Sequence, residues 1–79
     1  MTLLELKWYA EKMIKIYRDK LGDSDKLEDR DKFKYIEENI IDIFKNASDD
    51  INNEGSEYHE CELAAESIRQ FCNEQLDED

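Results

Sequence analysis

The sequence is short of the residues that shape tight turns. Its 79 residues include no proline and two glycines, Gly22 and Gly55. Small all-β folds rely on such residues in their hairpins, so a fold of that kind is disfavoured. No apolar run approaches the roughly 20 residues that span a bilayer. The N-terminus also lacks the basic region and apolar stretch of a secretory signal, which predicts a cytoplasmic protein.

Positive charge is scarce as well. The chain has 22 Asp and Glu against 11 Lys and Arg, which gives a formal net charge of −11. Proteins that bind nucleic acid through its phosphates need clustered Lys and Arg, and so do proteins that dock on anionic membranes. The composition therefore argues against direct contact with nucleic acid or with a membrane.

The sequence offers little for catalysis or for metal binding. Its one histidine, His59, falls on the outer face of an expected helix beside Glu62 and Glu66. One histidine with carboxylates at that spacing would hold a metal only weakly. Neither glycine belongs to a phosphate-binding loop, and so small a domain has little room for a concave pocket. We expect no enzyme, no metal and no cofactor.

The two cysteines, Cys61 and Cys72, are eleven residues apart on one expected helix. At about 1.5 Å of rise per residue they lie roughly 16 Å apart. A disulfide needs Cα atoms within about 7 Å, so an internal bridge is excluded. Both fall on the apolar face of the helix, where a buried free thiol behaves as a small hydrophobic group.

Apolar residues recur at spacings of three and four in three segments, 3–21, 29–52 and 56–76. Each set forms one stripe on a helix, which predicts three amphipathic helices. The stripes are Leu3, Leu6, Ala10, Met13, Tyr17 and Leu21; Phe33, Ile36, Ile40, Ile43, Phe44, Ala47 and Ile51; and Tyr58, Cys61, Ala64, Ala65, Ile68, Phe71 and Cys72. Short connections between them favour an all-α fold, a small antiparallel three-helix bundle, as a single domain over residues 1–79.

Several helix ends are marked in the sequence. Thr2 and Glu5 have the spacing of a capping box at the start of the first helix. Gly22 is expected to stop that helix in the left-handed conformation that glycine tolerates. Ser56 is expected to cap the third helix through its hydroxyl group.

The first connection and the C-terminal tail are less regular. Two arrangements are open for the connection: Ser24 or Asp25 caps a short turn around Leu27, or the chain stays irregular to about Asp29. The acidic tail, residues 77–79, is expected to be disordered, because acidic groups at a helix C-terminus oppose the helix dipole.

The charge is unevenly distributed along the chain. Residues 1–21 carry a net charge of +2 and the remaining residues a net charge of −13. Acidic side chains gather opposite the apolar stripes of the second and third helices: Asp31, Glu38, Asp42 and Asp49 on the second, and Glu62, Glu66 and Asp77 on the third. Charged outer faces can simply keep a small protein soluble. Solubility alone explains the excess of one sign poorly, because helix surfaces ordinarily mix signs.

The acidic faces suggest a small acidic protein-binding inhibitor that occupies a basic, nucleic-acid-binding surface on a partner protein. Carboxylates can take the place of phosphates in contacts with Arg and Lys. The partner would be a nucleic-acid-binding protein or a nuclease complex; some phage-encoded inhibitors of host defence nucleases have this size and charge, without a shared motif. The candidate residues are Asp31, Glu38, Asp42, Asp49, Glu62 and Glu66, with Tyr35 as an aromatic anchor.

Leu4 and Trp8 support a different hypothesis. They form an i, i+4 pair roughly opposite the apolar stripe of the first helix. Because Trp is enriched at interface hot spots, the pair could form the apolar interface of a small regulatory or immunity-type protein, or of a homodimer. The alternative is that Trp8 only covers an edge of the core or the connection between the first two helices.

Overall fold

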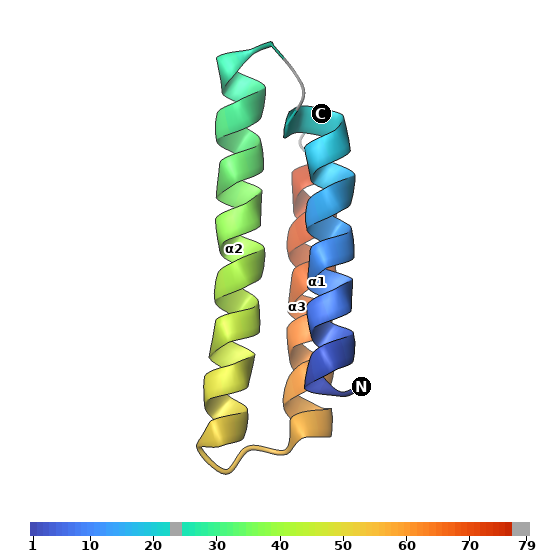
Figure 1. Ribbon diagram of the computed structural model, residues 1–79, viewed down its shortest axis with the longest axis vertical. Coiled ribbons are helices and arrows are strands. Elements are labelled where there is room, and N and C mark those ends of the chain that lie inside the picture. Colours follow the sequence, from blue (N-terminus) through green and yellow to red (C-terminus); the bar gives the residue numbers. More distant parts are fainter. Residues whose placement is uncertain (23–24, 77–79) are drawn as a thin grey trace.

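The computed structural model describes residues 1–22 and 25–76, and these residues form three α-helices and no strand. The helices are α1 (Leu3–Tyr17), α2 (Leu27–Asn52) and α3 (Glu57–Leu76). The chain runs up α1, down α2 and up α3, so consecutive helices are antiparallel (Figure 1). The bundle measures 44 × 19 × 16 Å. The all-α three-helix bundle predicted from periodicity is confirmed. The possible cap Ser24 and the tail, residues 77–79, lie outside the described residues.

The start of α1 has the predicted capping box. The Thr2 hydroxyl accepts from the Glu5 amide at 3.2 Å, and a Glu5 carboxylate oxygen accepts from the Thr2 amide at 3.1 Å. The pKa of Glu5 is lowered, because its carboxylate is stabilised first by the backbone amide of Thr2 and then by the Thr2 side chain. The end of the helix differs from the prediction: α1 continues into a π-helical turn, η1 (Arg18–Gly22), and Gly22 is not left-handed.

The second helix begins at Leu27, earlier than the predicted residue 29. Lys26 occupies the N-cap position without a side-chain capping bond, so a cap from Asp25 is wrong. Acidic groups in the first turn, Glu28 and Asp29, compensate by favouring the positive end of the helix dipole.

Within residues 1–22 and 25–76, the one residue with a left-handed backbone lies after α2, and it is not a glycine. Glu54 has φ 76°. The Gly55 amide then donates to the carbonyl of Asp50 at 2.8 Å, the bond pattern of a Schellman motif. Ser56 follows as the predicted cap of α3, its hydroxyl accepting from the His59 amide at 3.5 Å.

The core is narrow and draws on all three helices. Its buried members are Leu6, Ala10 and Tyr17 of α1; Ile36, Ile40 and Ala47 of α2; and Cys61, Ala64, Ile68 and Cys72 of α3. The Tyr17 hydroxyl donates to the backbone carbonyl of Cys72 at 2.9 Å, which ties α1 to α3. Burial raises the pKa of Tyr17 to about 12 and also raises the pKa of both thiols. Both cysteines are free and buried, as predicted.

One residue of the predicted stripes lies outside the core. Tyr58 is 67% exposed. It lies in the first turn of α3, level with the start of α1, where the Glu57 carboxylate accepts from the Leu3 amide at 3.0 Å. The prediction for Tyr58 fails because a stripe extends the core only as far as the neighbouring helices reach. No helix among the described residues is both long enough and apolar enough to cross a membrane.

Candidate partner-binding surface

The acidic row of α2 is the first part of the candidate surface. Its four members are exposed: Asp31, Glu38, Asp42 and Asp49. They extend over about 27 Å of helix axis at 1.5 Å per residue. On the helical wheel they lie opposite Ile36 and Ile40, which are fully buried. The row is therefore presented to solvent along most of one side of the bundle.

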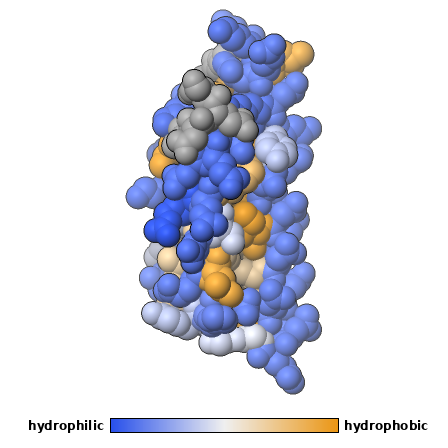
Figure 2. Space-filling view, turned by 180° about the vertical axis from the view of Figure 1, so that it is seen from behind, coloured by the Kyte–Doolittle hydropathy of each residue, from blue (hydrophilic) through white to orange (hydrophobic). Residues whose placement is uncertain are grey.

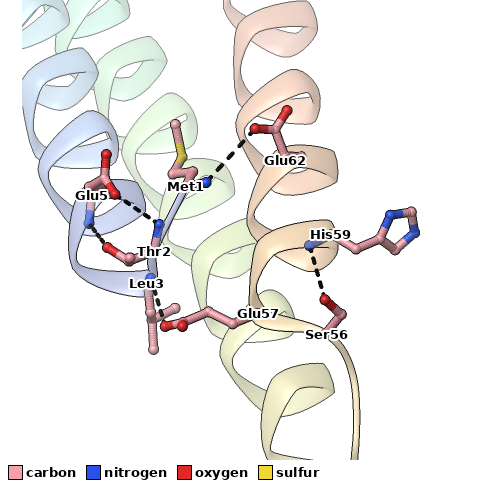
Figure 3. A network of polar contacts seen from close by, with 8 residues as sticks. All are labelled: Met1, Thr2, Leu3, Glu5, Ser56, Glu57, His59 and Glu62. Atoms are coloured by element: carbon pink, nitrogen blue, oxygen red, sulfur yellow. Dashed lines mark hydrogen bonds and ion pairs between the residues drawn. The ribbon is translucent and has the colours of Figure 1, made fainter.

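Glu62 and Glu66 of α3 lie on the side of that helix that faces α1. Both line a shallow hollow between α3 and Tyr9 of α1, together with Arg69. A Glu62 carboxylate oxygen lies 3.9 Å from the amino group of Met1, which brings the start of α1 against α3 (Figure 3). The structure therefore does not bring these two acids into one groove with the α2 row. Glu62 also contributes to the fold.

Tyr35 packs against another helix more than the sequence indicated. Its ring centroid lies 5.8 Å from that of Phe71, with the planes tilted by 55°. The side chain is still 54% exposed. Tyr35 therefore lies at the edge between α2 and α3, where it covers Phe71 with one face and keeps the other available.

Acidic residues concentrate towards the end of the bundle where α2 and α3 are joined. We call residues 37–66 the acidic half. It contains one cation, Lys45, and ten carboxylates: Glu37, Glu38, Asp42, Asp49, Asp50, Glu54, Glu57, Glu60, Glu62 and Glu66. Within this segment, all of which is described, the one carboxylate in an ion pair is Glu62. The other nine are in no ion pair, although the Glu57 carboxylate accepts a hydrogen bond from the Leu3 amide.

A groove runs between α2 and α3 within the acidic half. The α2 wall consists of Ile43, Asn46, Ala47 and Asp50, and the α3 wall consists of Glu60, Leu63, Ala64 and Ser67. Its volume is about 280 Å³. Seen from behind, where α3 lies in front, the lower part of the molecule shows apolar surface bordered by hydrophilic side chains (Figure 2). We call the groove between these two walls the α2–α3 groove.

The sequence held a signal for this groove that was missed. Leu63 does not belong to the apolar stripe of α3, and it is 48% exposed. Its apolar side chain lines the α3 wall of the groove. Asp50 was likewise not assigned to any site, because its position beside Glu60 depends on how two helices are rotated against each other.

A second hollow lies on the other side of α2, against α1. It has a volume of about 320 Å³ and is lined by Lys7, Ala10, Glu11, Ile14, Ile41, Phe44 and Lys45. We call it the α1–α2 hollow. Leu4 and Trp8 are 54% and 59% exposed on α1, outside the core. Trp8 therefore does not serve as a core residue, and the pair is accessible at the surface.

His59 and the cysteines do not form a metal centre in the described part of the chain. The His59 ring points away from α1 into solvent (Figure 3). Across residues 1–22 and 25–76, no three His, Cys, Asp or Glu side chains are grouped so that they could hold a metal ion.

No family model, curated protein or solved structure matches the chain. The fold is a simple bundle that many unrelated activities could use. The surfaces described above are therefore the observations on which a function can be proposed.

Proposed function

We propose that this chain is a small acidic protein-binding inhibitor that acts in the cytoplasm and occupies a basic, nucleic-acid-binding surface on a partner protein. One observation carries this: the acidic half has ten carboxylates and one cation. Arg and Lys side chains that grip phosphates can grip carboxylates with similar geometry. A rigid bundle would present these groups without ordering them at the moment of binding.

The dimensions of the α2 row are compatible with this role. Its carboxylates extend over about 27 Å, close to the roughly 34 Å of one turn of duplex DNA. DNA carries about one charge per 1.7 Å of axis, so the row is a sparser array. Because the row has fewer charges per unit length than DNA, it favours a partner whose basic groove concentrates positive potential. The strong potential in such a groove compensates for the lower charge density of the row.

Partner capture followed by competition tests this function. The chain is used to capture proteins from its native cells, and the captured protein is identified by mass spectrometry. We expect the chain to displace labelled duplex DNA or RNA from that protein. We also expect the affinity to fall as salt rises, since salt screens the charges.

Charge reversal identifies the surface responsible. The variant Glu38→Lys/Asp42→Lys/Asp49→Lys changes three exposed residues of the α2 row and should abolish displacement while the helical circular dichroism signal is retained. The matched control changes net charge equally at exposed positions elsewhere: Glu11→Lys, Asp19→Lys and Glu74→Lys. The function is wrong if both triple variants behave alike, or if the captured protein has no basic nucleic-acid-binding groove.

The exposed pair Leu4 and Trp8 supports a second candidate, a regulatory or immunity-type protein that binds through an apolar interface or forms a homodimer. Two large apolar side chains more than half exposed on one helix are typical of contact surfaces. Binding of this kind would change little with salt and would tolerate the triple reversal on α2. Trp8→Ala would reduce it, or would reduce the mass measured in solution if the chain is a dimer.

A further inference from the structure

The α2–α3 groove has the shape of a helix-docking site. Its walls take residues at i, i+3, i+4 and i+7 from each helix: Ile43, Asn46, Ala47 and Asp50, and Glu60, Leu63, Ala64 and Ser67. Each wall is therefore two helical turns long, about 10 Å. Ridges of side chains from a further helix fit between rows with this spacing.

The floor of the groove is small and apolar. Ala47 and Ala64 are buried at its base, while Ile43 and Leu63 form its sides. The two alanines leave space that a Leu or Ile side chain from another helix would fill. At about 280 Å³ the groove has room for an inserted side chain of this size.

One end of the groove is acidic. The helices are antiparallel, so Asp50 and Glu60 lie together at the end nearest the connection. A Cβ atom added to Gly55 would lie 2.5 Å from the Asp50 carbonyl oxygen and 3.1 Å from the Glu60 Cγ, which places both residues against the same glycine. Neither carboxylate is in an ion pair. Two acidic residues line this end of the groove and no basic residue lines any of it, so the charge that complements it is a cation from outside.

We propose that the α2–α3 groove binds a basic amphipathic helix of the partner protein, which deepens the proposed function and rests on it. The partner helix inserts a Leu or Ile side chain between Ile43 and Leu63. One turn further on, an Arg or Lys reaches Asp50 and Glu60, because about 5 Å of helix axis separates the centre of the groove from its acidic end. The complex is then a four-helix arrangement in which the partner supplies the fourth helix.

A labelled helical peptide is the direct probe. It is about 18 residues long, since shorter isolated helices are marginal in water. Leu residues follow i, i+3, i+4 and i+7 spacing, and Arg residues flank them. The control peptide has the same composition with its Leu residues distributed around the helix. Fluorescence anisotropy gives the affinity, and we expect the amphipathic peptide to bind at least about tenfold more tightly than the control.

Two groove variants and one matched control locate the binding. Ser67→Trp fills the groove from an exposed position, and Leu63→Ala removes one of its sides. Each should weaken the amphipathic peptide about tenfold or more, with helical circular dichroism unchanged. Leu4→Ala removes a comparably exposed leucine from α1 and should leave the affinity unchanged. In the unmodified chain, Trp8 is the one tryptophan, and its emission reports on the α1 side. We expect that emission spectrum to stay the same when the peptide binds.

Several results would overturn the groove as the docking site. Equal affinity for the two peptides would reduce the binding to charge alone, as would unchanged affinity in both groove variants. A shifted Trp8 emission with loss of binding in Leu4→Ala would assign the peptide to the α1 side. Self-association that is lost in Ser67→Trp would make a second copy the occupant. None of these results removes the proposed inhibitor function, which fails if both triple charge reversals affect displacement of nucleic acid alike, or if the captured protein has no basic nucleic-acid-binding groove.

Discussion

Two hollows flank α2, and they differ in the charge at their rims. The α2–α3 groove ends in Asp50 and Glu60 without a cation among its lining residues. The α1–α2 hollow has Lys7 and Lys45 beside Glu11. Both have an alanine at the base, Ala47 and Ala10 respectively, and larger apolar side chains around it. The two hollows therefore share an apolar floor and differ in the charge of their rims, so if both bind partners, the rim is the feature that would distinguish those partners.

The difference follows from which helices meet. The segment up to residue 21 carries a net charge of +2, and α1 contributes Lys7 to the α1–α2 hollow. No Lys or Arg lines the α2–α3 groove, and Lys45 of α2 lines the other hollow. A bundle with one basic and two acidic helices thus has one side that is acidic and one that is mixed, with a single core in common.

That common core gives the largest expected effect. Ile40 is fully buried, and Ile40→Asp would place an unpaired charge at the centre. The cost is several kcal/mol, as much as the roughly 3–5 kcal/mol that a core of this size supplies. We expect both hollows to disappear together, with loss of the helical circular dichroism signal at 25 °C.

The neighbouring residue supplies the control for that experiment. Ile41 is 37% exposed at the rim of the α1–α2 hollow, so Ile41→Asp should keep the fold and peptide binding at the α2–α3 groove. A helical signal in Ile40→Asp equal to that of wild type would mean that α2 is rotated relative to the core described here.

The second effect concerns Gly55, in the connection between α2 and α3, which packs against Asp50 and Glu60. A Cβ atom at Gly55 would meet the Asp50 carbonyl oxygen at 2.5 Å. Gly55→Ala should therefore lower the free energy of unfolding by about 1–3 kcal/mol and weaken peptide binding, because the end of the groove must shift. Urea denaturation and anisotropy measure the two.

The adjacent residue should respond in the opposite direction. Glu54 occupies the left-handed region with φ 76°, which costs a non-glycine residue about 1 kcal/mol. Glu54→Gly removes that cost and one charge at the C-terminus of α2, so we expect a higher melting temperature. A lower melting temperature in Glu54→Gly would contradict the left-handed turn.

How far the sequence predicts the molecule depends on how many helices determine each feature. The burial of Ile36 and Ile40 follows from the period of one helix, and it was predicted. The capping box of Thr2 and Glu5 is equally local. Tyr58 was misassigned because its burial depends on where α1 begins. The left-handed residue after α2 is Glu54, because the hydrogen bond from the Gly55 amide to the Asp50 carbonyl requires that backbone conformation at the residue before Gly55.

The candidate surface divides in the same way. The exposure of the acidic row on α2 could be predicted, because each member lies opposite the core of its own helix. The separation of Glu62 from that row could not, since it reflects the side of α3 that α1 covers. The α2–α3 groove requires the relative rotation of two helices. The off-stripe position of Leu63 is the one sign of it in the sequence.

The third effect separates the stability of the bundle from the groove. Tyr17 donates its hydroxyl hydrogen to the Cys72 carbonyl, away from both hollows. Tyr17→Phe removes this bond and should lower the free energy of unfolding by about 1 kcal/mol. Binding of the amphipathic peptide should not change. Tyr35→Phe, at an exposed tyrosine, is the matched control and should melt as wild type does at neutral pH.

Tyr17→Phe should also change how the stability of the fold depends on pH. The pKa of Tyr17 is about 12 in the folded chain against 10.0 for an ordinary tyrosine. The contribution of Tyr17 to the free energy of unfolding is fully present below pH 10. It is lost as the pH rises towards 12, because in this range Tyr17 ionises in the unfolded chain and stays neutral in the folded one. Tyr17→Phe should therefore flatten the fall in stability between pH 10 and 12. An identical alkaline fall in both proteins would show that Tyr17 is not buried as described.

The smallest expected effect concerns the acidic rim itself. Asp50 lies in the last turn of α2, which contains no basic residue, beside Glu60. A carboxylate there opposes the helix dipole and a neighbour of the same sign, so Asp50→Asn should stabilise the fold by about 0.3–1 kcal/mol at low salt. The gain should shrink at high salt, and the amphipathic peptide should bind less tightly. Glu28→Gln, in the first turn of the same helix, should destabilise instead, because it removes a favourable charge. Urea denaturation of both variants at low and high salt, with peptide affinity measured alongside, distinguishes two roles for Asp50. A gain in stability with a loss of binding in Asp50→Asn indicates that Asp50 serves the partner at the expense of the fold. A loss of stability would make Asp50 a structural residue and leave the groove without its cation-binding end.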